Sequence, residues 1–117
     1  MPHVVLKGKV YAQNIFDNLN PLFIRNKDLI LKTSKTYIDR EKKSILIESL
    51  VIEKKNKTDF LAIISEREDG VVVRIYPGSK VEKTEGVKRI LAETAKQLLD
   101  IFPELRVGKT NISDLLK

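Results

Sequence analysis

The segment from Leu29 to Tyr76 constrains the fold most, because it contains four strand-like runs joined by short polar connections. The runs are rich in Ile, Leu, Val, Thr and Tyr, which suit a pleated, half-buried surface. The connections are about two to five residues long, which permits antiparallel neighbours and excludes the longer crossovers that parallel strands need. We therefore predict four consecutive antiparallel strands, over Leu29–Asp39, Ser44–Glu53, Thr58–Glu66 and Val71–Tyr76.

The connection between the third and fourth runs carries the strongest turn signal in the chain, Asp69-Gly70 between two apolar segments. Asp-Gly is favoured in type I′ hairpin turns, because both central residues of such a turn have positive φ. We therefore predict a tight hairpin turn with Asp69 and Gly70 as its central residues.

A strand and a weak helix precede this block. Val4–Tyr11 alternates between apolar and polar residues, as a strand with one polar face does. Ala12–Leu19 has a short helical pattern, and Asn20 and Pro21 end it because a residue before proline avoids the α region. The segment Leu22–Ile24 either extends this helix irregularly or leads into the sheet.

A long amphipathic helix follows the block. Thr84 and Glu85 mark its start, because Gly86 is unfavourable further inside a helix. Apolar residues then recur at the i, i+3, i+4, i+7 spacing from Val87 to Phe102, and Pro103 ends the pattern. We predict an α+β fold, with an antiparallel sheet of about five strands in the order β-α-β-β-β-β-α and this helix packed on one face.

The length of 117 residues is that of one ordinary domain. We interpret residues 1–103 as a single α+β domain and residues 104–117 as a C-terminal tail, docked on the domain itself or on a partner. Within the tail, Leu105 and Val107 could form a short sixth strand.

The middle strands of the predicted sheet are apolar on both faces. A sheet with one solvated face should alternate between apolar and polar residues. We therefore expect the second face to be covered by a partner chain (most simply a second copy in a homodimer), by a ligand or by the C-terminal tail. The candidate interface residues on that face are Leu46, Leu50, Ile52, Leu61 and Ile63.

The positive charge is concentrated in one half of the chain. The net charge is +6; residues 1–57 hold 12 Lys and Arg against 6 Asp and Glu, and residues 58–117 hold 10 of each. A basic surface attracts polyanions. The candidate nucleic-acid-binding residues are Lys7, Lys9, Lys32, Lys35, Arg40, Lys42, Lys43, Lys54, Lys55 and Lys57.

This charge leads to one hypothesis and two alternatives. A non-enzymatic binding module would contact phosphates through the lysines of the turns, without reading bases. Successive hairpin turns lie at opposite ends of a sheet, so the turn lysines form one patch only if a ligand crosses the sheet or a dimer joins them. Alternatively, lysines at strand edges and turns only prevent edge pairing in an accessory subunit of a larger assembly, or the chain carries a small apolar ligand between sheet and helix.

The sequence contains no recognisable catalytic or metal-binding constellation. There is no cysteine, and His3 is the only histidine, so thiolate sites and histidine-based triads are not expected. Glu48 shares a strand face with apolar residues and is either an acid with a raised pKa or the partner of a cross-strand lysine. We expect no enzymatic activity, no cofactor and no metal.

No apolar run approaches the roughly 20 residues that a membrane span requires. Met1–Tyr11 lacks the long apolar stretch of a signal peptide. We therefore expect a cytoplasmic protein without membrane contact, and the composition, rich in Lys, Glu and Ile without cysteine, is of the kind found in thermophiles.

The predicted order of elements from Val4 to Phe102 resembles one repeat of the TATA-box-binding protein fold. A local similarity is the turn Pro77-Gly78-Ser79-Lys80 that leads into the long helix. The chain has no second repeat and none of the family's paired intercalating phenylalanines, so no DNA-reading residue is carried over. The resemblance implies helices on one face of the sheet and a saddle-like open face that binds a partner or dimerises.

Overall fold

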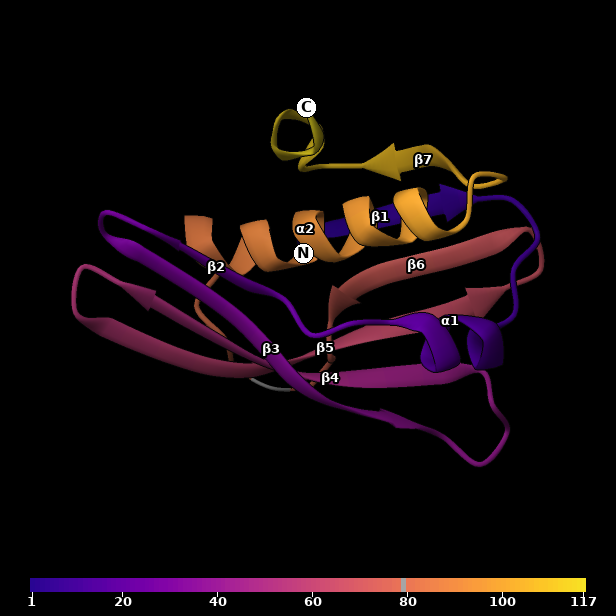
Figure 1. Ribbon diagram of the computed structural model, residues 1–117, viewed down its shortest axis with the longest axis horizontal. Helices are drawn as coiled ribbons and strands as arrows, with labels where there is room; N and C mark the ends of the chain where they lie inside the picture. The colour runs from indigo at the N-terminus through magenta and orange to yellow at the C-terminus, as the bar shows by residue number, and fades with distance from the viewer. Residues whose placement is uncertain (79) are drawn as a thin grey trace.

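The computed structural model describes residues 1–78 and 80–117 and shows a seven-stranded antiparallel sheet with two helices (Figure 1). Neighbouring strands follow the order β2-β3-β4-β5-β6-β1-β7. The strands are β1 (His3–Lys7), β2 (Phe23–Asn26), β3 (Leu29–Ile38), β4 (Ser44–Glu53), β5 (Asn56–Arg67), β6 (Gly70–Ile75) and β7 (Arg106–Thr110). The helices are α1 (Ala12–Asn18), α2 (Glu85–Ile101) and the 3-10 helix η1 (Ser113–Leu116).

The α+β class, the antiparallel meander and the long helix on the sheet are confirmed, but the strand number is higher than predicted. The additional strands β2 and β7 form the two edges of the sheet. An edge strand has one neighbour and needs little apolar pattern. Phe23–Asn26 is only four residues long and mostly exposed, which explains why the sequence signal for β2 was weak.

Helix α2 starts where the sequence predicts. The N-cap residue Thr84 accepts a hydrogen bond from the Val87 N–H through its Oγ1, at 3.2 Å. Glu53, at the end of β4, accepts hydrogen bonds from Thr84 Oγ1 at 2.6 Å and from the Gly86 N–H at 2.9 Å. A β carbon on Gly86 would lie 2.4 Å from the Val51 side chain, so glycine allows this close approach of helix and sheet.

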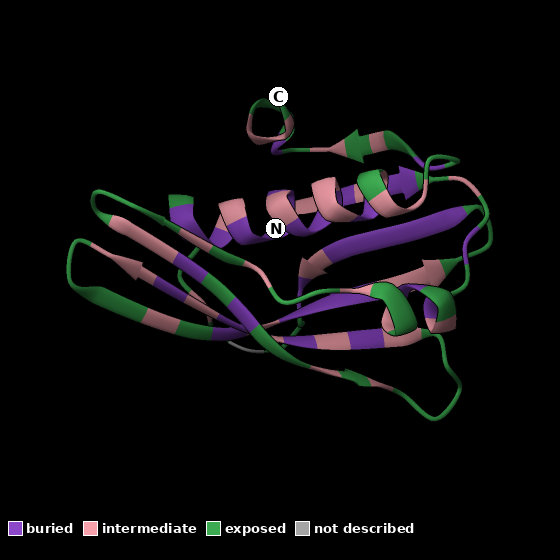
Figure 2. Ribbon diagram, in the orientation of Figure 1, coloured by how far each residue is buried: buried purple, intermediate pink, exposed green. Residues whose placement is uncertain are grey.

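The sheet curls around α2. This helix contacts β3 and β4 on one side and β6 and β1 on the other. Strands β3 and β1 are four intervals apart in the sheet, about 19 Å if it were flat, whereas a helix is only about 10 Å wide. Helix α1 contacts β3, β4 and β5. Both helices therefore lie on the concave side with the core, next to β6, which is buried along most of its length (Figure 2). The convex face stays open. The open face is thus convex and not a concave saddle.

The segment after α2 returns to the helix side of the molecule. Strand β7 pairs with β1, and η1 contacts α2. Ile112 is buried, and Leu115 and Leu116 pack against the core. Of the three expected covers for the second sheet face, the C-terminal tail is therefore excluded, and a partner chain or a ligand remains.

Two turn predictions need correction. Arg67 pairs with Gly70, so the central residues of the β5–β6 turn are Glu68 and Asp69, and Gly70 already belongs to β6. The hairpin turn with two central residues at positive φ is instead Lys54-Lys55, with φ of 46° and 73°. This shorter turn places Lys57 inside strand β5. Ser79, in the Pro77–Lys80 turn of the sequence resemblance, lies outside the described residues.

Glu66, near the end of β5, ties the start of α1 to the sheet. Its carboxylate accepts hydrogen bonds from the Ala12 N–H at 2.8 Å and from Lys43 Nζ at 3.0 Å. The hydrogen bond from Ala12 has the largest effect on the pKa of Glu66 and, together with Lys43, holds it below its ordinary value against the opposing effect of burial.

Replacing Glu66 with glutamine is expected to lower the free energy of unfolding at pH 7 by about 1 kcal/mol, because a neutral amide accepts these bonds more weakly. A depressed folded-state pKa gives stability that is present above the unfolded value, near 4.5, and is lost as pH falls through the folded value. Urea denaturation between about pH 5 and pH 3 should show a steeper loss for the wild type than for E66Q. Parallel pH profiles would contradict this role of Glu66.

Candidate nucleic-acid interface

The open face is built from cross-strand rows of side chains that alternate with the core residues. One row joins Arg25 on β2, Ile30 on β3, Ile52 on β4 and Lys57 on β5. The row thus has two isoleucines at its centre and one cation at each end. The strand register, and not proximity in sequence, brings these two charges to the same face.

The next row toward the middle of the sheet joins Phe23, Lys32, Leu50 and Asp59. Phe23 lies on the edge strand β2 and is 65% exposed. Asp59 lies 3.8 Å from Lys57, a loose ion pair between two exposed side chains. This row places an exposed aromatic ring beside a lysine on the open face.

At the end of the sheet next to the row of Arg25, the β2–β3 and β4–β5 turns meet and form a groove. The Lys54 N–H donates a hydrogen bond to the Asp28 carbonyl oxygen at 3.2 Å and so joins the two turns. The groove has a volume of about 520 Å³. We call it the basic groove; its lining comprises the cations Arg25, Lys27, Lys54 and Lys55, the polar residues Asn26 and Asp28, and the aliphatic residues Leu29, Ile30 and Ile52.

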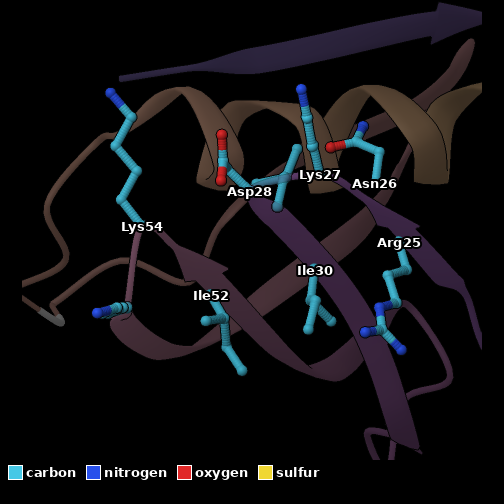
Figure 3. Close-up of a pocket in the computed structure, with 9 residues that line it drawn as sticks. Arg25, Asn26, Lys27, Asp28, Ile30, Ile52 and Lys54 are labelled. Carbon is cyan, nitrogen blue, oxygen red and sulfur yellow. The ribbon is translucent and has the colours of Figure 1, made fainter.

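The charges of the basic groove are poorly compensated. Figure 3 shows Lys27 and Lys54 extending to one side, with the single carboxylate of the lining, Asp28, between them, while Arg25 extends to the opposite side together with Ile30 and Ile52. Glu53 lies nearby in sequence, but its carboxylate is engaged with the start of α2. The lining therefore carries four cations against one carboxylate, which favours an anionic ligand.

Further along the open face, a row joins Tyr37, Leu46, Ile63, Arg74 and His3. The Tyr37 hydroxyl donates a hydrogen bond to Glu48 Oε2 at 2.5 Å, and this bond to a carboxylate raises the pKa of Tyr37 above its ordinary value. The ring of Tyr37 is thus neutral and held in one place. Glu48 has this tyrosine as its hydrogen-bond partner, not the cross-strand lysine that the sequence suggested.

Arg74 has an unusual position in this row. Its Nε is buried and has no hydrogen-bond partner within the described residues. The neighbouring side chains of its row, Ile63 and His3, offer no negative charge. No ion pair of the described residues involves Arg74, so none of their carboxylates directly neutralises this guanidinium.

The ten lysines and arginines that the sequence singled out do not form one patch. Three lie near the basic groove, Lys54 and Lys55 in the turn and Lys57 in β5, while Lys32 and Lys35 lie along β3. The others, Lys7, Lys9, Arg40, Lys42 and Lys43, lie toward the opposite end of the sheet, as the alternation of hairpin turns predicts. There Lys43 forms its ion pair with Glu66, and Glu41, Glu68 and Asp69 add negative charge.

The five candidate interface residues all lie on the open face. Ile63 is buried at 7% exposure, and Leu46, Leu50, Ile52 and Leu61 are half-buried. They form the apolar middle of the face, which extends from Ile52 in the lining of the basic groove to Leu46 and Ile63 in the row of Tyr37. No segment that the structure describes covers them, because both helices and η1 lie on the other side.

Arg25, Lys27, Phe23 and Arg74 were not identified from the sequence as site residues. The first three belong to the edge hairpin, whose strand was not predicted. Arg74 stands alone between apolar residues of β6, and only the register shows which residues lie beside it. The one sequence signal for this strand was the alternation of Phe23, Ile24 and Arg25, which would place Phe23 and Arg25 on one face and Ile24 on the other.

The described residues include no group of three or more histidine, aspartate or glutamate side chains that could hold a metal ion. Among the same residues, no helix combines the length and apolar character needed to cross a bilayer. Comparison of the chain with protein-family models, curated proteins and solved structures gives no match.

Proposed function

We propose that this protein is a non-enzymatic module that binds nucleic acid by holding phosphates in the basic groove. The observation that carries the proposal is the meeting of the two turns, which gathers Arg25, Lys27, Lys54 and Lys55 around one groove with a single carboxylate. Phosphate contacts of this kind give affinity without sequence reading.

The proposed phosphate contacts are confined to one end of the sheet and are not distributed over all the basic turns. The opposite end of the sheet carries Lys42 and Lys43 together with several acidic residues, and Lys43 is already paired. The basic groove has the larger uncompensated charge and an aliphatic floor. We therefore assign the phosphate contacts to Arg25, Lys27, Lys54 and Lys55, with Lys57, outside the groove lining and in a loose 3.8 Å ion pair with Asp59, as one further contact.

The salt dependence of binding tests this proposal. Labelled 12-nucleotide single-stranded and duplex DNA of mixed sequence are titrated with the protein by fluorescence anisotropy. With four or five phosphate contacts, the slope of log affinity against log salt should be about −3 to −4, so affinity falls about 50-fold or more between about 50 and 200 mM salt. Arg25→Gln should weaken binding to both DNAs several-fold and make the slope less steep by about one.

Lys117→Gln is the matched control, because Lys117 is an exposed cation that follows η1 on the helix side of the molecule. It removes the same charge and should leave affinity and slope close to the wild type. If neither DNA binds, or if R25Q and K117Q behave alike, the groove is not the site of phosphate contact.

A specific observation supports a second candidate, a structural subunit that associates through the open face. Leu46, Leu50, Ile52, Leu61 and Ile63 form an apolar area that nothing in the described chain covers. Light scattering at low and high salt separates the two candidates. A dimer whose mass is unchanged by salt would favour apolar self-association, since phosphate-type contacts weaken with salt.

A further inference from the structure

We infer that the ligand is a single-stranded nucleic acid whose bases stack on three exposed rings of the open face, Phe23, Tyr37 and Tyr76. This inference rests on the proposed function and names its substrate class. It assigns the phosphates to the basic groove and the bases to the convex sheet surface next to it.

The rings are presented where an unpaired base could reach them. Phe23, Tyr37 and Tyr76 are 65%, 46% and 41% exposed, although large aromatic side chains usually bury most of their surface. Phe23 and Tyr37 share the open face by strand register. Tyr76 continues the alternation of Val72 and Arg74 just beyond β6, where its N–H donates to the Leu61 carbonyl oxygen at 2.8 Å.

The space between the two tyrosines is a shallow apolar hollow. It has a volume of about 280 Å³, and Leu46 and Ile63 form part of its lining together with Tyr37 and Tyr76. Arg74 lies three strand intervals from Tyr37 in the same row, roughly 14 Å across the sheet. Tyr76 lies two residues beyond Arg74, so the two tyrosines are separated by several times the ~3.4 Å rise between stacked bases. Each ring would therefore take a base of its own, and an apolar floor would lie between them.

Cations on the same face complement the phosphates that join such bases. Arg25, Lys32, Lys57 and Arg74 lie on the open face, and none of the ion pairs of the described residues involves Arg74. Three carboxylates lie on this surface, against the four cations: Asp59 lies near Lys57, Glu48 accepts from the neutral Tyr37 hydroxyl and keeps its charge, and Asp39 lines the hollow beside Tyr37. The uncompensated charge of the face is therefore positive.

This charge and the shape of the sheet favour a nucleic acid over a second copy of the chain. Two copies meeting through this face would bring the same uncompensated cations together, which opposes association. Two convex surfaces also touch over a limited area, whereas stable complexes bury about 800 Å² on each partner. A flexible single strand can follow a convex surface, and base stacking on exposed rings requires bases that are not paired.

The test uses a triple variant that removes the rings and keeps apolar bulk, Phe23→Leu with Tyr37→Leu and Tyr76→Leu. Affinities for single-stranded 12-mers of RNA and of DNA, and for duplex DNA, are measured by fluorescence anisotropy at one salt concentration and as a function of salt. The wild type should prefer the single strands about 10-fold or more. The triple variant should lose about 10- to 100-fold of single-strand affinity, with the salt slope and duplex affinity unchanged.

Two controls distinguish stacking from other effects. Tyr37→Phe with Tyr76→Phe keeps both rings and should retain the single-strand affinity. Tyr11→Leu removes a ring that is 55% exposed but stands at the start of α1, away from the open face, and should have no effect.

Each remaining outcome has a distinct meaning. Equal affinity of the wild type and the triple variant for single strands would overturn the stacking inference and leave the proposed function intact. If the wild-type protein binds none of the oligonucleotides, the proposed function is rejected. A wild-type dimer in light scattering that the triple variant converts to a monomer, without any preference for single strands, would show that a second copy occupies the face and would also overturn the inference.

Discussion

Replacing Gly70 with alanine is expected to lower the free energy of unfolding by about 3 kcal/mol or more, the largest effect of any single substitution considered for this protein. Gly70 starts β6 and pairs with Lys7 of β1. A β carbon at this position would lie 2.0 Å from the Leu6 carbonyl oxygen and 3.1 Å from Lys7 Cα. Both neighbours are backbone atoms of a central strand, so relief requires that β1 and β6 move apart.

Urea denaturation of G70A, with Glu68→Ala as the control, measures this effect. Glu68 is an exposed residue of the same turn, and its replacement should change stability by less than about 0.5 kcal/mol. The strand pair lies at the end of the sheet opposite the basic groove, so the folded fraction of G70A should bind nucleic acid with unchanged affinity. If G70A unfolds at the same urea concentration as the wild type, the close approach of β1 and β6 does not require a glycine at this position.

The reason for this glycine also shows what the sequence could and could not predict. Asp69-Gly70 correctly marked a hairpin, because turn residues act locally. The residue that Gly70 must approach, Leu6, is far away in sequence, and only strand pairing reveals the contact. The strands β3 to β6 and the helix α2 could be predicted because their signal is local. A long alternating or helical pattern of apolar residues indicates directly which side of the element is buried.

The candidate site was only partly visible in the sequence for a related reason. Lys54, Lys55 and Lys57 were identified by charge, but the groove depends on the edge hairpin that supplies Arg25 and Lys27. A four-residue edge strand buries too little to need a clear apolar pattern. Arg25 and Lys57 share one face of the sheet only because of the register of four strands. No local sequence pattern encodes such a register.

The turn between β4 and β5 combines backbone strain with charge. Lys54 and Lys55 both adopt positive φ, a conformation that costs a residue with a side chain about 1 kcal/mol or more. Asparagine and glycine are the residues that such a turn favours for stability. Two lysines at these positions therefore give up stability, and the proposed phosphate contacts provide a reason for them.

The double variant Lys54→Asn with Lys55→Gly should accordingly change stability and binding in opposite directions. We expect the free energy of unfolding to rise by about 1 kcal/mol, because the new residues suit the turn. Nucleic-acid affinity should fall about 10-fold at about 100 mM salt, and the salt slope should become less steep by about two, because two phosphate contacts are lost. Urea denaturation and anisotropy titrations on the same preparations measure both effects.

Lys42→Gly is the matched control for this pair of effects. Lys42 also has positive φ, at 58°, and carries the same charge, but it lies in the β3–β4 turn at the other end of the sheet. Its replacement should likewise raise stability while leaving affinity and salt slope unchanged. If K42G weakens binding as much per charge removed as the double variant does, the phosphates are held by the whole basic surface and not by the groove. If the double variant binds like the wild type, Lys54 and Lys55 have no part in binding.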